Sequence, residues 1–171
     1  DLDRMAEIER EVDHDLIAFL RATGETVGPD ARFIHMGLTS TDVVDTAQAT
    51  QLVAAADLLG NRLRELTDVV GRQAVTYKDT LMVGRTHGMH AEPTTFGLKL
   101  AVWYDELRRH QRRLALARED IAVGKISGAV GTHAHVPASL EEDVCAALGL
   151  QAAPASTQVL QRDRHAFFLS V

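Results

Sequence analysis

Two long segments of the chain repeat mostly apolar residues at alternating steps of four and three. The first series runs Leu52, Ala56, Leu59, Leu63, Leu66, Val70, and the second runs Phe96, Leu100, Trp103, Leu107, His110, Leu114, Ala117, Ile121. A mean repeat of about 3.5 residues keeps one stripe of a helix facing a partner helix. The pattern predicts helices over about 41–77 and from after Pro93 to near Gly124, roughly 50 and 45 Å long. Helices of this length do not bury their stripes inside a compact globule, so we expect an all-α fold, an elongated bundle of long helices.

Two shorter helices are also expected. Residues 2–22 carry apolar residues on one broad face, and Gly24 is placed to end that helix. Ser139 to Glu142 has the pattern of a capping box that opens a short helix, which Gly149 would close. The polar, glycine-bearing stretches 24–40, 78–93, 124–138 and 149–160 are then short loops that carry the chemistry. The runs 81–83 and 158–160 are expected to be too short for a sheet.

Composition excludes several classes of function. The chain has 18 Lys and Arg against 24 Asp and Glu, a net charge of −6, and only 5% aromatic residues, which argues against a nucleic-acid binder. It has no run of about 18 apolar residues and no signal peptide at its start, so no membrane association is expected. A single cysteine, Cys145, suits a reducing cytoplasm. The start without Met and the end inside an apolar run suggest a piece of a longer polypeptide.

Histidines and small polar residues gather in the loops. Residues 84–97 combine glycines with Arg85, Thr86, His87 and His90, and imidazoles exchange protons near neutral pH. Residues 35–42 bring hydroxyls and free N–H groups to a helix start, which favours a bound carboxylate or phosphate. These residues alone are also compatible with an ordinary helix cap at 39–42 and a surface pair at 14–15. The residue pattern therefore predicts a long helical oligomer with histidine-rich loops and names no substrate.

Metal and nucleotide sites are disfavoured by spacing. His87-x-x-His90 and His133-x-His135 lack a matching third ligand. Neither a P-loop nor a G-x-G-x-x-G turn is present, and no G-x-S-x-G elbow marks a serine hydrolase. We therefore expect no metal site and no nucleotide site of the P-loop or G-x-G-x-x-G kind.

Five strings resemble the fumarase/aspartase superfamily and, within it, the adenylosuccinate lyase family, in the order and spacing of that family. They are HDLIAF at 14–19, HMGLTSTDVVD at 35–45, GRTHGMHAEPTTFG at 84–97, GKISGAVGT at 124–132 and STQVLQRDRH at 156–165. The resemblance implies the superfamily's long-helix bundle, with 1–40 as the end of an N-terminal helical domain and 41–171 as the first part of the central bundle domain. It implies a cytoplasmic homotetramer without a cofactor. Its activity would be β-elimination of fumarate from adenylosuccinate, giving AMP, and from the succinylcarboxamide imidazole ribotide of purine biosynthesis.

The resemblance also implies roles for individual residues. His87 matches the general acid that protonates the departing nitrogen, and His14 would orient charged groups or assist proton transfer. The residues expected to bind the substrate are Asp13, His14, Asp15, His35, Thr39, Ser40, Thr86 and Gln158. In the family each site is assembled from three subunits, so the His14/Thr39 and His87 clusters would come from different chains. Alternatives are a sister enzyme such as a carboxymuconate cycloisomerase, or a helical oligomerisation scaffold without catalysis.

One element of the family pattern is missing. The family's base is a serine on a mobile loop reading roughly S-S-x-M-P-x-K-x-N, and nothing between Asp1 and Val171 matches it. The β-carbon proton of the succinyl group is weakly acidic, so its removal needs this base. We expect the loop beyond Val171, and we expect this fragment alone to be inactive.

Overall fold

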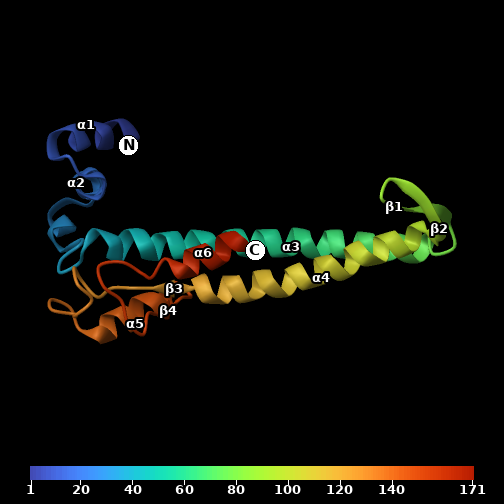
Figure 1. Cartoon of the computed structure of the whole chain (residues 1–171). Coiled ribbons are helices and arrows are strands. Elements are labelled where there is room, and N and C mark those ends of the chain that lie inside the picture. Colours follow the sequence, from blue (N-terminus) through green and yellow to red (C-terminus); the bar gives the residue numbers. More distant parts are fainter. The chain divides into compact units, whose positions relative to one another are not determined.

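A computed structural model describes all residues from Asp1 to Val171 and divides them into two compact units. Unit 1 comprises residues 1–50 and 122–161, and unit 2 comprises residues 51–121 and 162–171. The elements are labelled in Figure 1. None of the helices combines the length and the apolar composition that crossing a bilayer requires.

Unit 2 is built on the two long helices that the heptad spacing predicts. α3 runs over Ser40–Thr76, and its first turns belong to unit 1, while α4 runs over Phe96–Ile121. Small residues let the two helices approach closely: the ring of Tyr104 would lie 3.0 Å from a Cβ placed on Gly71. A short helix, α6 (Asp163–Ser170), packs against α4. The all-α fold class and both long helices are confirmed.

A β-hairpin joins α3 to α4, contrary to our expectation that residues 81–83 are too short for a sheet. β1 (Leu81–Thr86) pairs antiparallel with β2 (Met89–Thr95), with an irregularity between Val83 and Arg85. The strand extends through Gly84 because Gly84 has no side chain: a Cβ there would lie 2.5 Å from the carbonyl oxygen of Glu92. The sequence interpretation placed the whole stretch 78–93 in a loop and so missed the strand.

The N-terminal part of unit 1 holds two helices where one was predicted over 2–22. α1 (Leu2–Val12) ends at Asp13, whose φ of 51° lies in the left-handed region, and α2 (Asp15–Val27) begins after His14. His14 caps α2, because its Nδ1 accepts a hydrogen bond from the backbone N–H of Ile17 at 3.4 Å. α2 then continues past Gly24 into a 3-10 turn, η1 (Gly28–Phe33). A polar capping side chain thus splits an otherwise continuous apolar pattern.

The second part of unit 1 contains α5 (Ala138–Ala147) and a two-residue parallel pairing between β3 (Val123–Gly124) and β4 (Gln151–Ala152). Val123, Ala153 and Leu160 form its buried cluster. The predicted capping box is wrong: Pro137 precedes α5 without a side-chain cap, and the buried carboxylate of Glu141 instead accepts from the N–H of Ile126 at 2.6 Å. The end of this helix before Gly149, which has a φ of 70°, is as expected.

Candidate functional site

The start of α3 is joined by side-chain hydrogen bonds to two other segments of unit 1. Asp42, fully buried in the first turn, accepts four hydrogen bonds through its two carboxylate oxygens. Oδ1 accepts from the ammonium of Lys125 and from the N–H of Ser127 at 3.1 Å. Oδ2 accepts from the N–H of Thr39 at 2.9 Å and from the N–H of Gly128 at 3.1 Å. One carboxylate therefore joins the helix start to the glycine-bearing loop 124–128.

A second set of bonds fixes the same loop to the next turn of α3. The hydroxyl of Thr46 donates to the carbonyl oxygen of Lys125 and accepts from the Lys125 N–H, both at 3.0 Å. Both residues are buried. The loop is consequently held through both the N–H and the carbonyl oxygen of Lys125.

The segment 156–160 is attached to the same turns. The hydroxyl of Thr41 donates to the backbone oxygen of Gln158, and Asp45 accepts from the N–H of Leu160 at 2.8 Å. The hydroxyls of Ser127 and Ser156 are 2.7 Å apart. The structure thus holds the backbones of two predicted substrate-binding residues, Thr39 and Gln158, in one polar network, and Ser40 follows Thr39 directly in the chain.

Thr39 and Ser40 keep their hydroxyls free within that network. Thr39 immediately precedes α3 and Ser40 is its first residue, and both are half-buried. The network holds Thr39 through its backbone N–H. The side-chain oxygens of Thr39 and Ser40 take part in no hydrogen bond within the chain. Free hydroxyls and N–H groups at a helix start are suited to a carboxylate or phosphate.

The other predicted residues of unit 1 lie in two local turns. Asp13, His14 and Asp15 form the junction between α1 and α2, where His14 serves as the cap described above and Asp15 accepts from the N–H of Leu16 at 2.6 Å. His35 has a φ of 70°, and its Nε2 is buried without a hydrogen-bond partner. No hydrogen bond or ion pair joins these residues to the Asp42 network.

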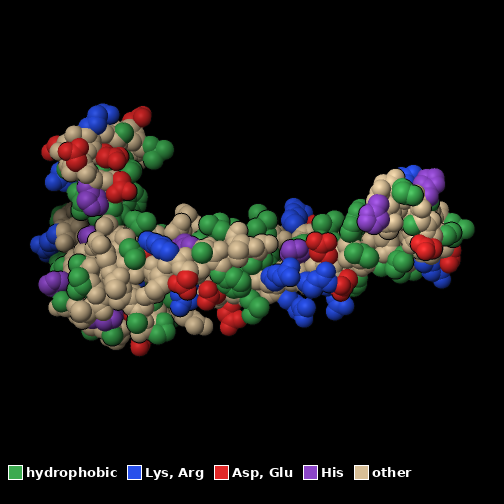
Figure 2. Space-filling model, in the orientation of Figure 1, with side chains coloured by type: hydrophobic (Ala, Val, Ile, Leu, Met, Phe, Trp, Pro, Cys, Tyr) green, Lys and Arg blue, Asp and Glu red, His purple; other side chains and the backbone are tan.

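Thr86 and His87 belong to unit 2, at the tip of the hairpin. Both residues are exposed, and Thr86 pairs with Met89 across a two-residue turn. His87 and Gly88 have φ values of 53° and 72°, the pair of positive angles that a type I′ turn requires. Figure 2 shows histidine side chains on the surface of the hairpin. An exposed imidazole on a tight turn is accessible to a substrate, as a proton donor must be.

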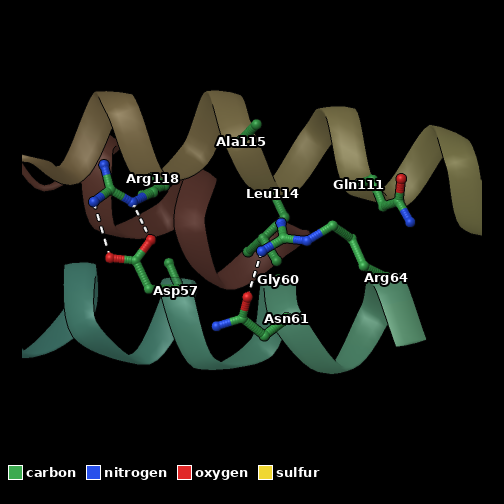
Figure 3. Close-up of a pocket in the computed structure, with 9 residues that line it drawn as sticks. Asp57, Gly60, Asn61, Arg64, Gln111, Leu114, Ala115 and Arg118 are labelled. Carbon is green, nitrogen blue, oxygen red and sulfur yellow. Dashed lines mark hydrogen bonds and ion pairs between the residues drawn. The ribbon is translucent and has the colours of Figure 1, made fainter. Parts of the chain in front are cut away.

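The hollow in Figure 3 is formed by a different set of side chains. It lies between α3 and α4 in unit 2, with small residues and two arginines around it, and includes none of the predicted site residues. Asp57 and Arg118 face each other there at 2.6 and 2.9 Å, and Arg64 donates to Asn61. No group of three or more His, Cys, Asp or Glu side chains is placed to hold a metal ion.

Sequence reasoning missed the buried framework beside the free hydroxyls, in which Asp42 holds the backbone of Thr39 while Thr46 holds only the backbone of Lys125. Lys125 and Thr46 were not predicted to contribute, although a lysine inside the otherwise uncharged string 124–132 is a signal for a buried pair. The predicted roles of the site residues stay predictions, since the contacts show placement and not chemistry.

Comparison with known proteins supports the superfamily that the motifs indicate. The family described as Lyase matches residues 2–171. Over 170 residues the chain is 52% identical to the adenylosuccinate lyases of Staphylococcus saprophyticus and Bacillus subtilis, which covers 99% of this chain and 39% of each relative. The chain therefore spans about two fifths of the length of these relatives.

Solved structures agree with the fold. A 3-carboxy-cis,cis-muconate lactonizing enzyme from Pseudomonas putida matches with a TM-score of 0.90 at 34% identity, over 99% of this chain and 40% of that one. A fumarate lyase from Mesorhizobium sp. BNC1 matches with a TM-score of 0.92 at 28% identity, over 99% of this chain and 41% of that one. Since the family match extends over nearly the entire chain, the chain belongs to the lyase family.

Proposed function

We propose that the full-length protein eliminates fumarate from adenylosuccinate, and from the succinylcarboxamide imidazole ribotide, in purine biosynthesis. The observation that carries the proposal is the 52% identity to two adenylosuccinate lyases over essentially the whole chain. The free hydroxyls of Thr39 and Ser40 at the start of α3 support it, because the substrate carries carboxylates and a phosphate. The reaction needs only acid–base chemistry, so we propose that no metal or cofactor takes part.

In this mechanism His87 is the general acid. An imidazole can donate a proton to a reacting group, here the departing nitrogen. Thr86, beside it on the hairpin, would hydrogen-bond the succinyl portion, as would Gln158. Asp13, His14, Asp15 and His35 would line the nucleotide end. We propose that the base on the β-carbon is a serine outside the chain described here.

We further propose that the active protein is a cytoplasmic homotetramer with shared sites. Residues 1–40 would end its N-terminal domain, and 41–171 would begin its central bundle domain. Support comes from the apolar stripes of the long helices, where Leu59, Leu66 and Trp103 are 54%, 50% and 46% exposed in the single chain. Apolar surface of this extent is typical of an interface between subunits.

The test is turnover of adenylosuccinate by the full-length protein and by its His87→Gln variant. We expect turnover to fall by a factor of about 10³ or more with nucleotide binding retained, since general acid catalysis contributes about 10²–10⁴. His90→Gln is the matched control, because His90 is an exposed histidine of the same hairpin. Near-normal turnover by His87→Gln would remove the mechanism.

Sharing of sites between subunits has its own test. Mixed tetramers of His87→Gln and Thr39→Val subunits should recover part of the activity that each variant lacks alone, because some sites would receive neither substitution. No recovery after mixing would show that each site is built from one chain.

The structural likeness to a lactonizing enzyme favours a second candidate, cycloisomerisation of a carboxymuconate. Its lower identity of 34% ranks it behind the first. Assaying the full-length protein on both substrates separates the two, and activity on neither would favour a non-catalytic helical scaffold.

A further inference from the structure

The carboxylate of Asp42 has more hydrogen bonds than a helix cap needs. Its Oδ2 accepts from the N–H of Thr39, which is the reciprocal half of a capping box, at 2.9 Å. The other three donors belong to the loop 124–128, which lies far along the chain from α3. The side chain is completely shielded from water. The carboxylate thus acts on two segments at once.

Lys125 supplies the charge that makes this burial tolerable. Its ammonium donates to Asp42 Oδ1 and, at 3.4 Å, to the carbonyl oxygen of Gly128, and the side chain is as inaccessible as that of Asp42. A buried ion pair is weak grounds for stability, because apolar residues of similar volume often stabilise a fold equally well or better. A contribution to stability therefore does not explain why the pair is buried, and the hydrogen bonds of Asp42 suggest another role.

That geometry leads to the substrate-binding residues. The Oδ2 atom accepts from the backbone N–H of Thr39. The position of this backbone determines where the free hydroxyls of Thr39 and Ser40 lie. Thr41, in the same turn, holds the backbone of Gln158. Movement of this turn would displace all three proposed substrate contacts together.

We propose that Asp42 is a positioning residue for substrate binding, acting through the N–H of Thr39 and through the loop amides of Ser127 and Gly128. Its carboxylate does not touch the substrate. Lys125 supplies the counter-charge and holds Oδ1 of the carboxylate in place by its hydrogen bond. This inference rests on the proposed function for the roles of Thr39 and Ser40.

The test compares Asp42→Asn with Thr46→Val in the full-length protein. In Asp42→Asn the amide group that replaces the carboxylate has a single acceptor oxygen, so at least one tether is lost. Thr46→Val removes two buried hydrogen bonds to the backbone of Lys125 but leaves the Thr39 tether intact. Both variants are expected to lower the unfolding temperature, and Asp42→Asn should lower it more, because it leaves the ammonium of Lys125 buried without a counter-charge.

The two variants should differ in their kinetics. We expect Asp42→Asn to raise the KM for adenylosuccinate at least tenfold with kcat within threefold, as loss of uniform binding does. Thr46→Val should leave both constants within twofold. Equal changes in KM for the two variants would show that Asp42 serves stability alone and would overturn the inference.

Hydrogen exchange in residues 35–40 reports the tether without any substrate. Faster exchange there in Asp42→Asn than in Thr46→Val supports the inference, and unchanged exchange overturns it. Absence of turnover in the unmodified protein would instead refute the proposed function, so the two failures are distinguishable. If Asp42→Asn does not fold, the double variant Asp42→Asn with Lys125→Met, which buries no charge, is measured with the same expectations.

Discussion

Two aspartates of the same helix, α3, form ion pairs with opposite consequences. Asp42 in unit 1 and its partner Lys125 are both fully shielded from water, whereas Asp57 and Arg118 in unit 2 are 54% and 42% exposed. The exposed pair has the better geometry, with two guanidinium nitrogens facing two carboxylate oxygens (Figure 3). Water and salt screen it, however, so exposed pairs contribute little. Burial, and not geometry, decides which pair the fold depends on.

The largest effect predicted from this comparison follows Lys125→Met. It leaves the Asp42 carboxylate buried without a counter-charge, and breaking a buried pair in this way costs about 3–5 kcal/mol. Urea unfolding of the full-length protein measures the loss. Adding Asp42→Asn removes the stranded charge and should recover part of the stability. A loss as small as that of a surface substitution would show that Asp42 accepts enough hydrogen bonds from amides to be stable alone.

The next effect concerns Gly131, which follows the loop 124–128 that Asp42 holds. Gly131 has a φ of 81°, and a Cβ there would lie 2.0 Å from the carbonyl oxygen of Ser156. Gly131→Ala should cost about 1–2 kcal/mol for the left-handed backbone and roughly a further 1 kcal/mol for displacing Ser156. Gly149→Ala is the matched control, since Gly149 has a φ of 70° with open space around it. Equal losses in the two variants would mean that segment 156–160 moves freely.

A smaller effect is expected at Cys145, which lies in the interior of unit 1. Burial raises the pKa of its thiol, and the nearby Glu141 carboxylate raises it further, while the N–H of Gly124 partly offsets both. At any pH below that raised pKa, a smaller fraction of Cys145 is therefore present as the thiolate, which is the form that reacts. Alkylation by iodoacetamide at about pH 8, followed by peptide mass spectrometry of the full-length protein, should be at least tenfold slower before unfolding than after it. Equal rates would show that unit 1 opens readily.

Much of the fold could be predicted from apolar spacing alone. The long helices α3 and α4 follow the heptad stripes because an apolar repeat of about 3.5 residues keeps one face of an α-helix toward a partner helix along its whole length. The failures lie where one polar or small residue overrides the pattern. His14 caps α2 and so divides the predicted helix in two. The carboxylate of Glu141 accepts from the N–H of Ile126 instead of forming the predicted capping box. Gly84 allows β1 to continue where a loop was predicted.

Motifs predicted residues for the candidate site, but they did not predict the hydrogen-bonded framework around the start of α3. Motifs predicted Thr39, Ser40 and Gln158, and in the structure Asp42 holds the backbone of Thr39 while Thr41 holds that of Gln158. Sequence spacing carries no information on which distant amide a carboxylate will accept from. Long-range hydrogen bonds of this kind therefore need coordinates, whereas helix periods do not.

The smallest effect is predicted for Asp57→Asn, which tests the exposed half of the comparison. Hydrogen bonding by Arg118 lowers the pKa of Asp57, and partial burial opposes that shift. A lowered pKa means that the contribution of this carboxylate is present above its unfolded pKa and is lost as the pH falls through the folded value. Any difference in stability between Asp57→Asn and the unmodified protein should therefore be largest at neutral pH, and it should be smaller in acid and smaller in high salt.

We expect the unfolding midpoint of Asp57→Asn at neutral pH to be unchanged within error, because solvent screens the pair. A loss comparable to that of Lys125→Met would mean that Asp57 and Arg118 are buried in the working protein by a neighbouring subunit.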